Sequence, residues 1–279
     1  MLRASTKDRG DLIEIAHQLA RRSWVANHDG NISLRLKSSS RSPRFLATPT
    51  ATAKADVCEK NLIEVDGQGK KLAGSARPFS ELAMHLEVFR QRDDVVAVIH
   101  AHPPYATALA CSGSSIIRRP YIAEAIVSLG PLIPTLPFAA PGPDSVTTLA
   151  QEVPRVDAVL VANHGVFTWG PTLELAYLRM ELVEHLAKIA TLAQATGGVR
   201  ALPEDVLEKL LLSRSKAGLG AAADRAMDFA AKAVVACAPA PHSTVKTVSH
   251  RGAQPTATPS PQESSKLAAI IRDELSKFL

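Results

Sequence analysis

The stretch VVAVIHAHPPYATALA, residues 95–110, decides the fold and raises the question of function. Its first five residues, Val95 to Ile99, form an apolar run typical of strands covered on both faces. His100 and His102 follow, and two prolines then end the strand before a helical pattern of small residues. Side chains two residues apart on a strand point to the same side, so the imidazoles can converge. The pair predicts either a metal site or two ordinary histidines that bond within a loop.

A second apolar strand leads to a third histidine. Residues 158–162 (AVLVA) are followed by the turn Asn163-His164-Gly165. If the two strands are neighbours that end together, three imidazoles surround one point, which is the pattern of a catalytic zinc with an open position. Taken alone, His164 is equally well explained as a turn residue that caps a strand.

Glu81 is the fourth candidate residue of this site. It follows Ser80 near the start of a predicted helix, where a carboxylate is favoured by the helix dipole. The alternative interpretation is an ordinary glutamate in a first helical turn.

Strand and helix patterns alternate irregularly along the first 200 residues. Such mixing favours one α/β domain with helices that cover a sheet. The predicted helices span residues 9–24, 104–112, 120–128 and 172–196, with another that begins at Pro78; the predicted strands lie within residues 32–36, 44–50, 62–66, 95–99, 158–162 and 166–170.

The last 79 residues differ in composition from the first 200. Residues 201–237 are predicted to form a helical extension. Residues 238–265, rich in Pro, Ser, Thr and Ala, are predicted to be a disordered linker, since they hold too few large apolar groups to build a core. Residues 266–279 are predicted to form a short amphipathic helix, which needs a partner because a helix of this length is marginal alone. That partner is either another protein or the chain's own assembly.

Composition narrows the class of protein. The chain has 279 residues, of which 46% are hydrophobic and 21% charged, as in ordinary globular proteins. The net charge of +5 suits an anionic substrate; the basic residues are scattered and aromatic residues make up 4%, so we expect no nucleic-acid partner. No apolar run approaches a membrane span, so no membrane partner is expected either. Three cysteines without a CxxC pair predict no disulfide framework, which indicates a cytoplasmic protein.

Five motifs together resemble one known family. The segments GNIS, TPT, SE, HAHPPYA and NHGVFTWG occur in an order and spacing similar to those of the class II aldolase/adducin family, over about residues 9 to 196. Within the family, the nearest enzyme type is the L-fuculose-1-phosphate aldolase. The resemblance implies a three-layer α/β/α domain over residues 1–200, with a mostly antiparallel central sheet covered by helices.

The resemblance also implies a metal-dependent lyase. His100, His102 and His164, together with Glu81, would hold one Zn²⁺ per subunit, or another divalent metal such as Mn²⁺. The ion would bind the substrate's carbonyl and hydroxyl oxygens and stabilise the enediolate, with Glu81 as general acid/base. The reaction would be cleavage of a ketose 1-phosphate such as L-fuculose 1-phosphate into dihydroxyacetone phosphate and lactaldehyde.

The family's phosphate pocket maps onto three loops of this chain. The matching residues are Gly30, Asn31, Thr50, Ala51 and Ser80. The first serine of the family's SSE motif is Phe79 here, which removes a hydroxyl donor; Arg77 is expected to compensate, because a guanidinium is well shaped for phosphate. Tyr121 is the candidate proton donor to the leaving aldehyde. The family further implies a homotetramer with active sites between subunits.

Alternatives remain open at this stage. Sugar-phosphate dehydratases and decarboxylases of the same family share the histidines and the glutamate. Epimerase members carry aspartate where this chain has Glu81, and adducin-like members lack the metal histidines. An alternative of another class is a non-catalytic scaffold protein that uses its tail as an interaction module.

The linker and the terminal segment resemble the encapsulation peptides of bacterial microcompartment cargo enzymes. This resemblance implies that residues 266–279 bind a shell protein. The enzyme would then lie in the lumen of a microcompartment within the cytoplasm, where a shell would retain the aldehyde product.

Overall fold

The computed structural model describes residues 4–37 and 42–219. Its centre is an eight-stranded sheet with the order β4-β3-β2-β1-β5-β8-β7-β6. The neighbouring strands of this sheet pair in antiparallel fashion, except that β6 and β7 are parallel. The predicted mostly antiparallel sheet is therefore confirmed. The strands are β1 (Asn31–Arg35), β2 (Arg44–Ala47), β3 (Ile63–Asp66), β4 (Lys71–Ala73), β5 (Ala97–Ala101), β6 (Thr135–Leu136), β7 (Ala158–Val161) and β8 (Gly165–Gly170).

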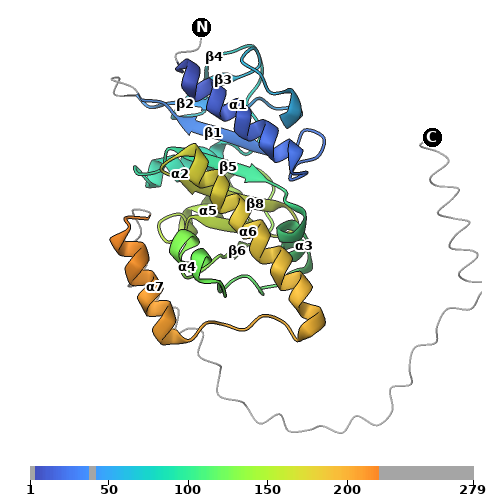
Figure 1. The fold of residues 1–279 in the computed structure, drawn as a ribbon. Helices are drawn as coiled ribbons and strands as arrows, with labels where there is room; N and C mark the ends of the chain where they lie inside the picture. Colours follow the sequence, from blue (N-terminus) through green and yellow to red (C-terminus); the bar gives the residue numbers. More distant parts are fainter. Residues whose placement is uncertain (1–3, 38–41, 220–279) are drawn as a thin grey trace, which may run out of the picture. The chain divides into compact units, whose positions relative to one another are not determined.

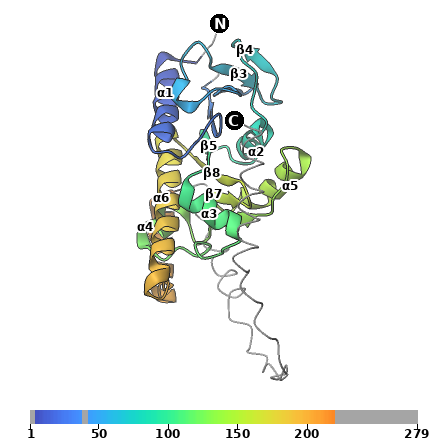
Figure 2. The same cartoon turned by 90° about the vertical axis from the view of Figure 1, so that its right-hand side faces the viewer.

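Helices cover both faces of this sheet and complete the predicted three layers (Figures 1 and 2). One face carries α1, α4 and α6, with α3 packed beside α6, and the opposite face carries α2 and α5. The bounds are α1 (Thr6–Arg21), α2 (Leu82–Gln91), α3 (Pro104–Ser112), α4 (Ala123–Leu129), α5 (Pro143–Glu152), α6 (Leu173–Ala193) and α7 (Glu204–Lys216), with short 3-10 helices η1 (Lys54–Asp56) and η2 (Gln194–Thr196).

The apolar run of β5 serves both layers of the core, as its pattern predicted. Ala97 and Ile99 pack in the cluster beneath α1 and α6, whereas Val98 packs in the cluster beneath α2 and α5. Because side chains alternate along a strand, His100 lies on the same side as Val98 and faces the α2 layer. The α2 layer therefore receives the imidazole.

Two elements differ from the sequence-based expectation. Helix α1 begins at Thr6 rather than at residue 9, because Ser5 and Asp8 form a capping box: the Asp8 amide donates to Ser5 Oγ over 3.0 Å. Helix α5 (Pro143–Glu152) was not predicted. Its start lies in a stretch dense in proline and glycine that is typical of loops, although proline is well tolerated in a first helical turn.

The predicted helical extension is described as far as residue 219. Its helix α7 packs against α4, where Leu211 contacts the partly separate cluster around Ile126. The rest of the extension, the predicted linker 238–265 and the predicted helix 266–279 lie outside the described residues. Among the described helices, none combines the length and apolarity that a membrane crossing requires.

Candidate metal and substrate site

Three histidines meet at one end of the central strands. His100 is near the end of β5, His102 follows it, and His164 lies in the turn between β7 and β8. The Nε2 atom of His100 is 3.1 Å from Nε2 of His102 and 3.0 Å from Nε2 of His164. The predicted convergence is present, but β5 and β7 are not neighbours. Strand β8 lies between them, and its start pairs with the end of β5.

A close backbone approach makes this meeting possible. A Cβ atom on Gly165 would lie 2.4 Å from Cδ2 of His102 and 2.6 Å from the carbonyl oxygen of Ala101. Real side chains do not tolerate such contacts, so glycine is required at the start of β8. The turn therefore depends on Gly165 to bring His164 beside His100.

The partners of the other ring nitrogens determine which atoms are free for a ligand. His100 Nδ1 lies 2.9 Å from the Val166 carbonyl oxygen, which can only accept, so Nδ1 carries the proton and Nε2 a lone pair. His102 Nδ1 lies 3.3 Å from Asp29 Oδ2. Burial, reinforced by the neighbouring His102, holds the pKa values of His100 and His164 below the ordinary range. Neutral imidazole is the form that binds metals.

These donors fit a divalent metal ion. One ligand atom from each of the three histidines lies within 4.8 Å of the others. Nitrogen ligands of a tetrahedral zinc, about 2.0–2.1 Å from the ion, are roughly 3.4 Å apart, close to the spacing measured here. Three imidazoles with an open fourth side suit a catalytic rather than a structural ion.

Glu81 lies beside the histidines. It precedes α2 as its N-cap residue, yet its side chain makes no capping hydrogen bond to the helix. Instead, Oε2 accepts hydrogen bonds from Ser80 Oγ (2.7 Å) and Asn31 Nδ2 (3.3 Å), while Oε1 is 3.9 Å from His164 Nε2. The carboxylate is held at the edge of the metal site rather than at the helix terminus.

The Gly-Asn turn reaches the site from β1. Gly30 has φ +71°, and a Cβ atom there would lie 2.6 Å from the Val25 side chain and 2.9 Å from the His100 carbonyl oxygen. Asn31 is opposite His100 in the antiparallel ladder. Its Nδ2 binds Glu81, and its buried Oδ1 has no hydrogen-bond partner within the described structure. Such an atom is available to a bound ligand.

The other predicted phosphate residues cluster on two adjoining loops. The Thr50 amide donates to the Arg77 carbonyl oxygen over 3.0 Å, which holds the TPT loop against the segment before α2. Ala51 adopts the left-handed conformation with φ +53°, and its side chain is exposed. Arg77 and Ser80 are also exposed. Ser80 Oγ is bound to Glu81 here, so it helps to orient the carboxylate.

Phe79 replaces the expected serine and is buried. Its ring meets that of His85 edge-on, with the centroids 5.0 Å apart. His85 is completely buried, and its Nδ1 lies 2.7 Å from Ser33 Oγ. Burial lowers the pKa of His85 to about 3. Phe167 joins this layer to the site, because it also stacks on His100 with the centroids 4.1 Å apart. Phe79 thus belongs to an apolar floor beneath the metal site.

Tyr121 is not brought to the histidines. It packs against the cluster beneath α1 and α6, and its hydroxyl donates to the Leu186 carbonyl oxygen of α6. Burial raises the pKa of Tyr121 to about 12. The hydroxyl proton of Tyr121 therefore points toward α6 and not toward the histidines.

Sequence reasoning missed two charged residues near the site. Asp29 lies 3.3 Å from His102 Nδ1, and Lys54 is 1% exposed beneath the loop that carries Thr50. The position of Asp29 directly before the Gly-Asn turn was a usable signal. Lys54 gave none, because a lysine in a loop is ordinarily solvated.

Comparisons with known proteins find relatives of this chain. The chain is 31% identical over 185 residues to a 3-oxo-tetronate 4-phosphate decarboxylase of Escherichia coli, an alignment that covers 65% of this chain and 84% of the relative. It is 32% identical over 184 residues to an L-fuculose phosphate aldolase of Methanococcus vannielii, covering 65% and 94%.

The fold has counterparts of known structure. The solved structure of an L-fuculose 1-phosphate aldolase superimposes with a TM-score of 0.68 and 28% sequence identity, over 74% of this chain and 95% of the other. Residues 10–191 match the family model described as the class II aldolase and adducin N-terminal domain, which is more than half of the chain. With the motif order, the three-layer fold and this match together, the chain belongs to the class II aldolase and adducin family.

Proposed function

We propose that this protein is a metal-dependent aldolase that cleaves a ketose 1-phosphate, such as L-fuculose 1-phosphate, into dihydroxyacetone phosphate and lactaldehyde. The observation that carries the proposal is the convergence of His100, His102 and His164 with the Glu81 carboxylate at its edge. The named relatives of this chain all act on phosphorylated sugar derivatives, which supports a sugar-phosphate substrate.

The three histidines would hold one divalent ion, with zinc as the first candidate and manganese as the alternative. Glu81 is proposed as a further ligand or as the general acid/base next to it. A bound ion of this kind supplies Lewis-acid polarisation of a carbonyl oxygen. The Nε2 atoms of His100 and His102 are free to face the ion because their Nδ1 atoms meet a carbonyl and a carboxylate oxygen, respectively.

Glu81 is well placed to move a proton. Hydrogen bonds from Ser80 and Asn31 occupy Oε2, which leaves Oε1 facing the histidines. In the proposed cleavage, the carbon–carbon bond breaks as the substrate hydroxyl loses its proton, and Glu81 Oε1 would deliver a proton to the carbon next to the carbonyl. Because one oxygen is already bonded, the carboxylate is oriented before a substrate arrives.

The phosphate of the substrate would bind between the Gly-Asn turn and the TPT loop. The donors proposed there are the amides around Gly30, Asn31 and Ala51 and the Thr50 hydroxyl, since the Thr50 amide is bonded to the Arg77 carbonyl oxygen and Ser80 to Glu81. Arg77 would complete the pocket, because its backbone is bonded to Thr50 and its side chain is exposed.

Tyr121 stays proposed as the group that exchanges the proton of the leaving aldehyde's oxygen: it would accept the hydroxyl proton during cleavage and donate it to the aldehyde in the reverse addition. Its hydroxyl would first have to leave the Leu186 carbonyl oxygen, so a rearrangement of this segment forms part of the proposal. A Tyr121→Phe variant tests it: retention of full aldol cleavage would assign this proton exchange elsewhere.

The function is tested by incubating the metal-loaded protein with a panel of ketose phosphates and measuring dihydroxyacetone phosphate. Release of this product from L-fuculose 1-phosphate is expected. A protein that binds neither zinc nor manganese would contradict the enzyme proposal and favour the scaffold alternative.

A decarboxylase is the second candidate, because a relative of that activity is 31% identical to this chain. It would use the same metal site on a phosphorylated oxo-acid. Release of CO₂ from such an acid, without aldehyde from any ketose phosphate, would replace the first proposal. Loss of water from the substrate would indicate a dehydratase.

The assembly is proposed to be a homotetramer with its active sites between subunits. The segment 266–279 is proposed to bind a microcompartment shell protein, which would place the enzyme in the lumen. The amphipathic sequence of that segment supports this proposal. Deletion of residues 255–279 should leave cleavage intact and abolish co-assembly with shell proteins. Loss of cleavage in the truncated enzyme would show that the tail serves the enzyme itself.

A further inference from the structure

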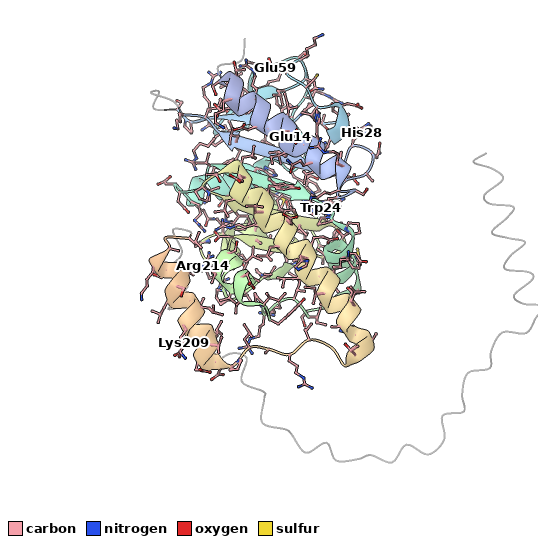
Figure 3. The ribbon with its side chains drawn as sticks, viewed as in Figure 1. Glu14, Trp24, His28, Glu59, Lys209 and Arg214 are labelled. Atoms are coloured by element: carbon pink, nitrogen blue, oxygen red, sulfur yellow. The ribbon has the colours of Figure 1, made fainter. Side chains whose placement is uncertain are left out.

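Lys54 is a buried cation between two loops of the site. It begins η1 directly after the TPT loop, and 1% of its surface is exposed. Its Nζ donates to the Thr52 carbonyl oxygen over 2.8 Å and to the His28 carbonyl oxygen over 3.3 Å. Figure 3 labels His28 on the segment that follows α1, so this one ammonium group links that segment to the TPT loop.

Both acceptors of Lys54 are neutral carbonyl groups. Within the described part of the chain no carboxylate lies in ion-pair distance of Nζ, and the charges of Asp29 and Glu81 act on it from further away. Burial lowers the pKa of Lys54 to about 8. An ammonium group without a directly bonded carboxylate is costly to bury. A neutral donor could bond the same two carbonyl groups without the cost of burying a charge. The positive charge of Lys54 therefore needs an explanation beyond this link.

The loops that Lys54 joins are those proposed to bind phosphate. One carries Gly30 and Asn31, which follow His28 after Asp29, and the other carries Thr50 and Ala51 directly before Thr52. A buried charge acts over several ångströms when the effective permittivity is low, so no direct contact with the anion is needed. Because Phe79 stands where the family has a serine, the proposed phosphate pocket has one hydroxyl donor fewer. A positive charge behind the loops would then contribute more to phosphate binding.

We propose that Lys54 is a positioning and specificity residue for the substrate phosphate. It holds the two phosphate-binding loops together and, as a buried cation behind them, selects a dianionic ligand over a neutral one. This inference rests on the proposed function, in particular on a phosphorylated substrate.

Two substitutions separate the charge from the link. Lys54→Met removes both, whereas Lys54→Gln keeps an amide that can donate to a carbonyl group but carries no charge. The metal-loaded full-length variants are titrated with inorganic phosphate. Both variants should bind inorganic phosphate about tenfold or more weakly than the unmodified protein. In the cleavage of a ketose phosphate, both should show a raised KM and a smaller change in kcat. Lys209→Met, on the exposed face of α7 (Figure 3), is the control and should bind phosphate normally.

A second measurement uses the unmodified protein and so does not depend on whether a variant folds. Phosphate affinity is followed from about pH 7 to about pH 9.5, on both sides of the Lys54 pKa. Affinity should fall as the pH rises through about 8, because the ammonium group loses its proton, and Lys54→Met should not show this fall.

The outcomes distinguish this inference from the proposed function. Phosphate affinity that is unchanged in Lys54→Gln, or independent of pH in the unmodified protein, would overturn the role of the charge while cleavage of ketose phosphates stands. An unmodified protein that binds no phosphate and cleaves no ketose phosphate would overturn both.

Discussion

The same central strands carry two buried polar clusters, one at each end, and the clusters are built in opposite ways. At one end are His100, His102 and His164, whose Nε2 atoms face one another. At the other end Asp157, directly before β7, meets the guanidinium groups of three arginines. We call these the histidine end and the arginine end.

The arginine end is held together by ion pairs within the chain. Arg92 binds Asp157 Oδ1 at 3.1 Å and both oxygens of Asp94 at 2.8 Å. Arg179 Nη2 is 2.9 Å from Asp157 Oδ2, which also accepts a bond from Arg214 of α7. Figure 3 labels Arg214 on α7, which this bond ties to the strands. These groups join α2, β7, α6 and α7, and they serve stability.

The histidine end has no shared central carboxylate like Asp157 among its described residues. Its three imidazole Nε2 atoms face one another, Asn31 Oδ1 lacks a hydrogen-bond partner, and Lys54 lacks a bonded carboxylate within the described chain. Residues other than glycine with positive φ also gather in its loops, at Asn27, Ala51 and Asn163. Unsatisfied groups and backbone strain are typical of functional sites. The difference teaches that buried polar atoms without a hydrogen-bond partner do not mark a site by themselves, since the arginine end also holds them, at Nε of Arg179 and of Arg214. What distinguishes the histidine end is that ring nitrogens converge on one point, whereas the charges of the arginine end are paired with a carboxylate.

The largest effect is expected at the histidine end. His164→Ala removes one of the three nitrogen ligands, so turnover should fall by about 10³-fold or more, since a bound ion contributes several kcal/mol to the transition state. Metal content by elemental analysis should fall with it. The urea midpoint of the metal-free protein should change little, because His164 is partly exposed. Full turnover in this variant would overturn the metal assignment.

The next effect concerns the arginine end. Asp157→Ala leaves three buried guanidinium groups without their shared carboxylate, and the free energy of unfolding should drop by about 3–5 kcal/mol. Urea denaturation measures this. Asp205→Ala, from an exposed pair with Lys209 on α7, is the matched control and should leave the midpoint unchanged. Metal stoichiometry of the folded Asp157→Ala protein should stay normal; its loss would show that the two ends are coupled.

A smaller effect is expected for the carboxylate behind His102. Asp29→Asn keeps an oxygen 3.3 Å from Nδ1 but removes the charge, so zinc affinity should weaken by about tenfold. Competition with a chelator measures the affinity, and stability without metal should not change. Asp93→Asn, an exposed surface residue, is the control. Equal affinities in all three proteins would mean that Asp29 does not orient the ligand.

The smallest effect tests backbone strain at the histidine end. Ala51 has φ +53°, a conformation that glycine adopts without penalty, so Ala51→Gly should raise the free energy of unfolding by up to about 1 kcal/mol. The urea midpoint measures it. A lower midpoint would show that the loop is not strained and that the added freedom of the unfolded chain dominates.

Much of this fold could be predicted from local patterns. The apolar runs of β5 and β7 and the long α6 are confirmed. The mostly antiparallel sheet, which the family resemblance implied, is confirmed too. Helix α5 was missed because its proline-rich start is typical of a loop. The residues of the proposed metal site were named from the sequence, since histidines and a glutamate beside strand ends indicate metal chemistry, and their binding of an ion stays a prediction.

Local patterns determine elements and ligand types because hydrogen bonding and side-chain alternation act over a few residues. They contain no information on which strands pair. Only the tertiary structure decided that β8 lies between β5 and β7, that Gly165 brings His164 beside His100, and that Tyr121 turns toward α6. It alone placed Lys54 beneath the loops and Asp157 among three arginines, because such contacts join residues far apart in the chain.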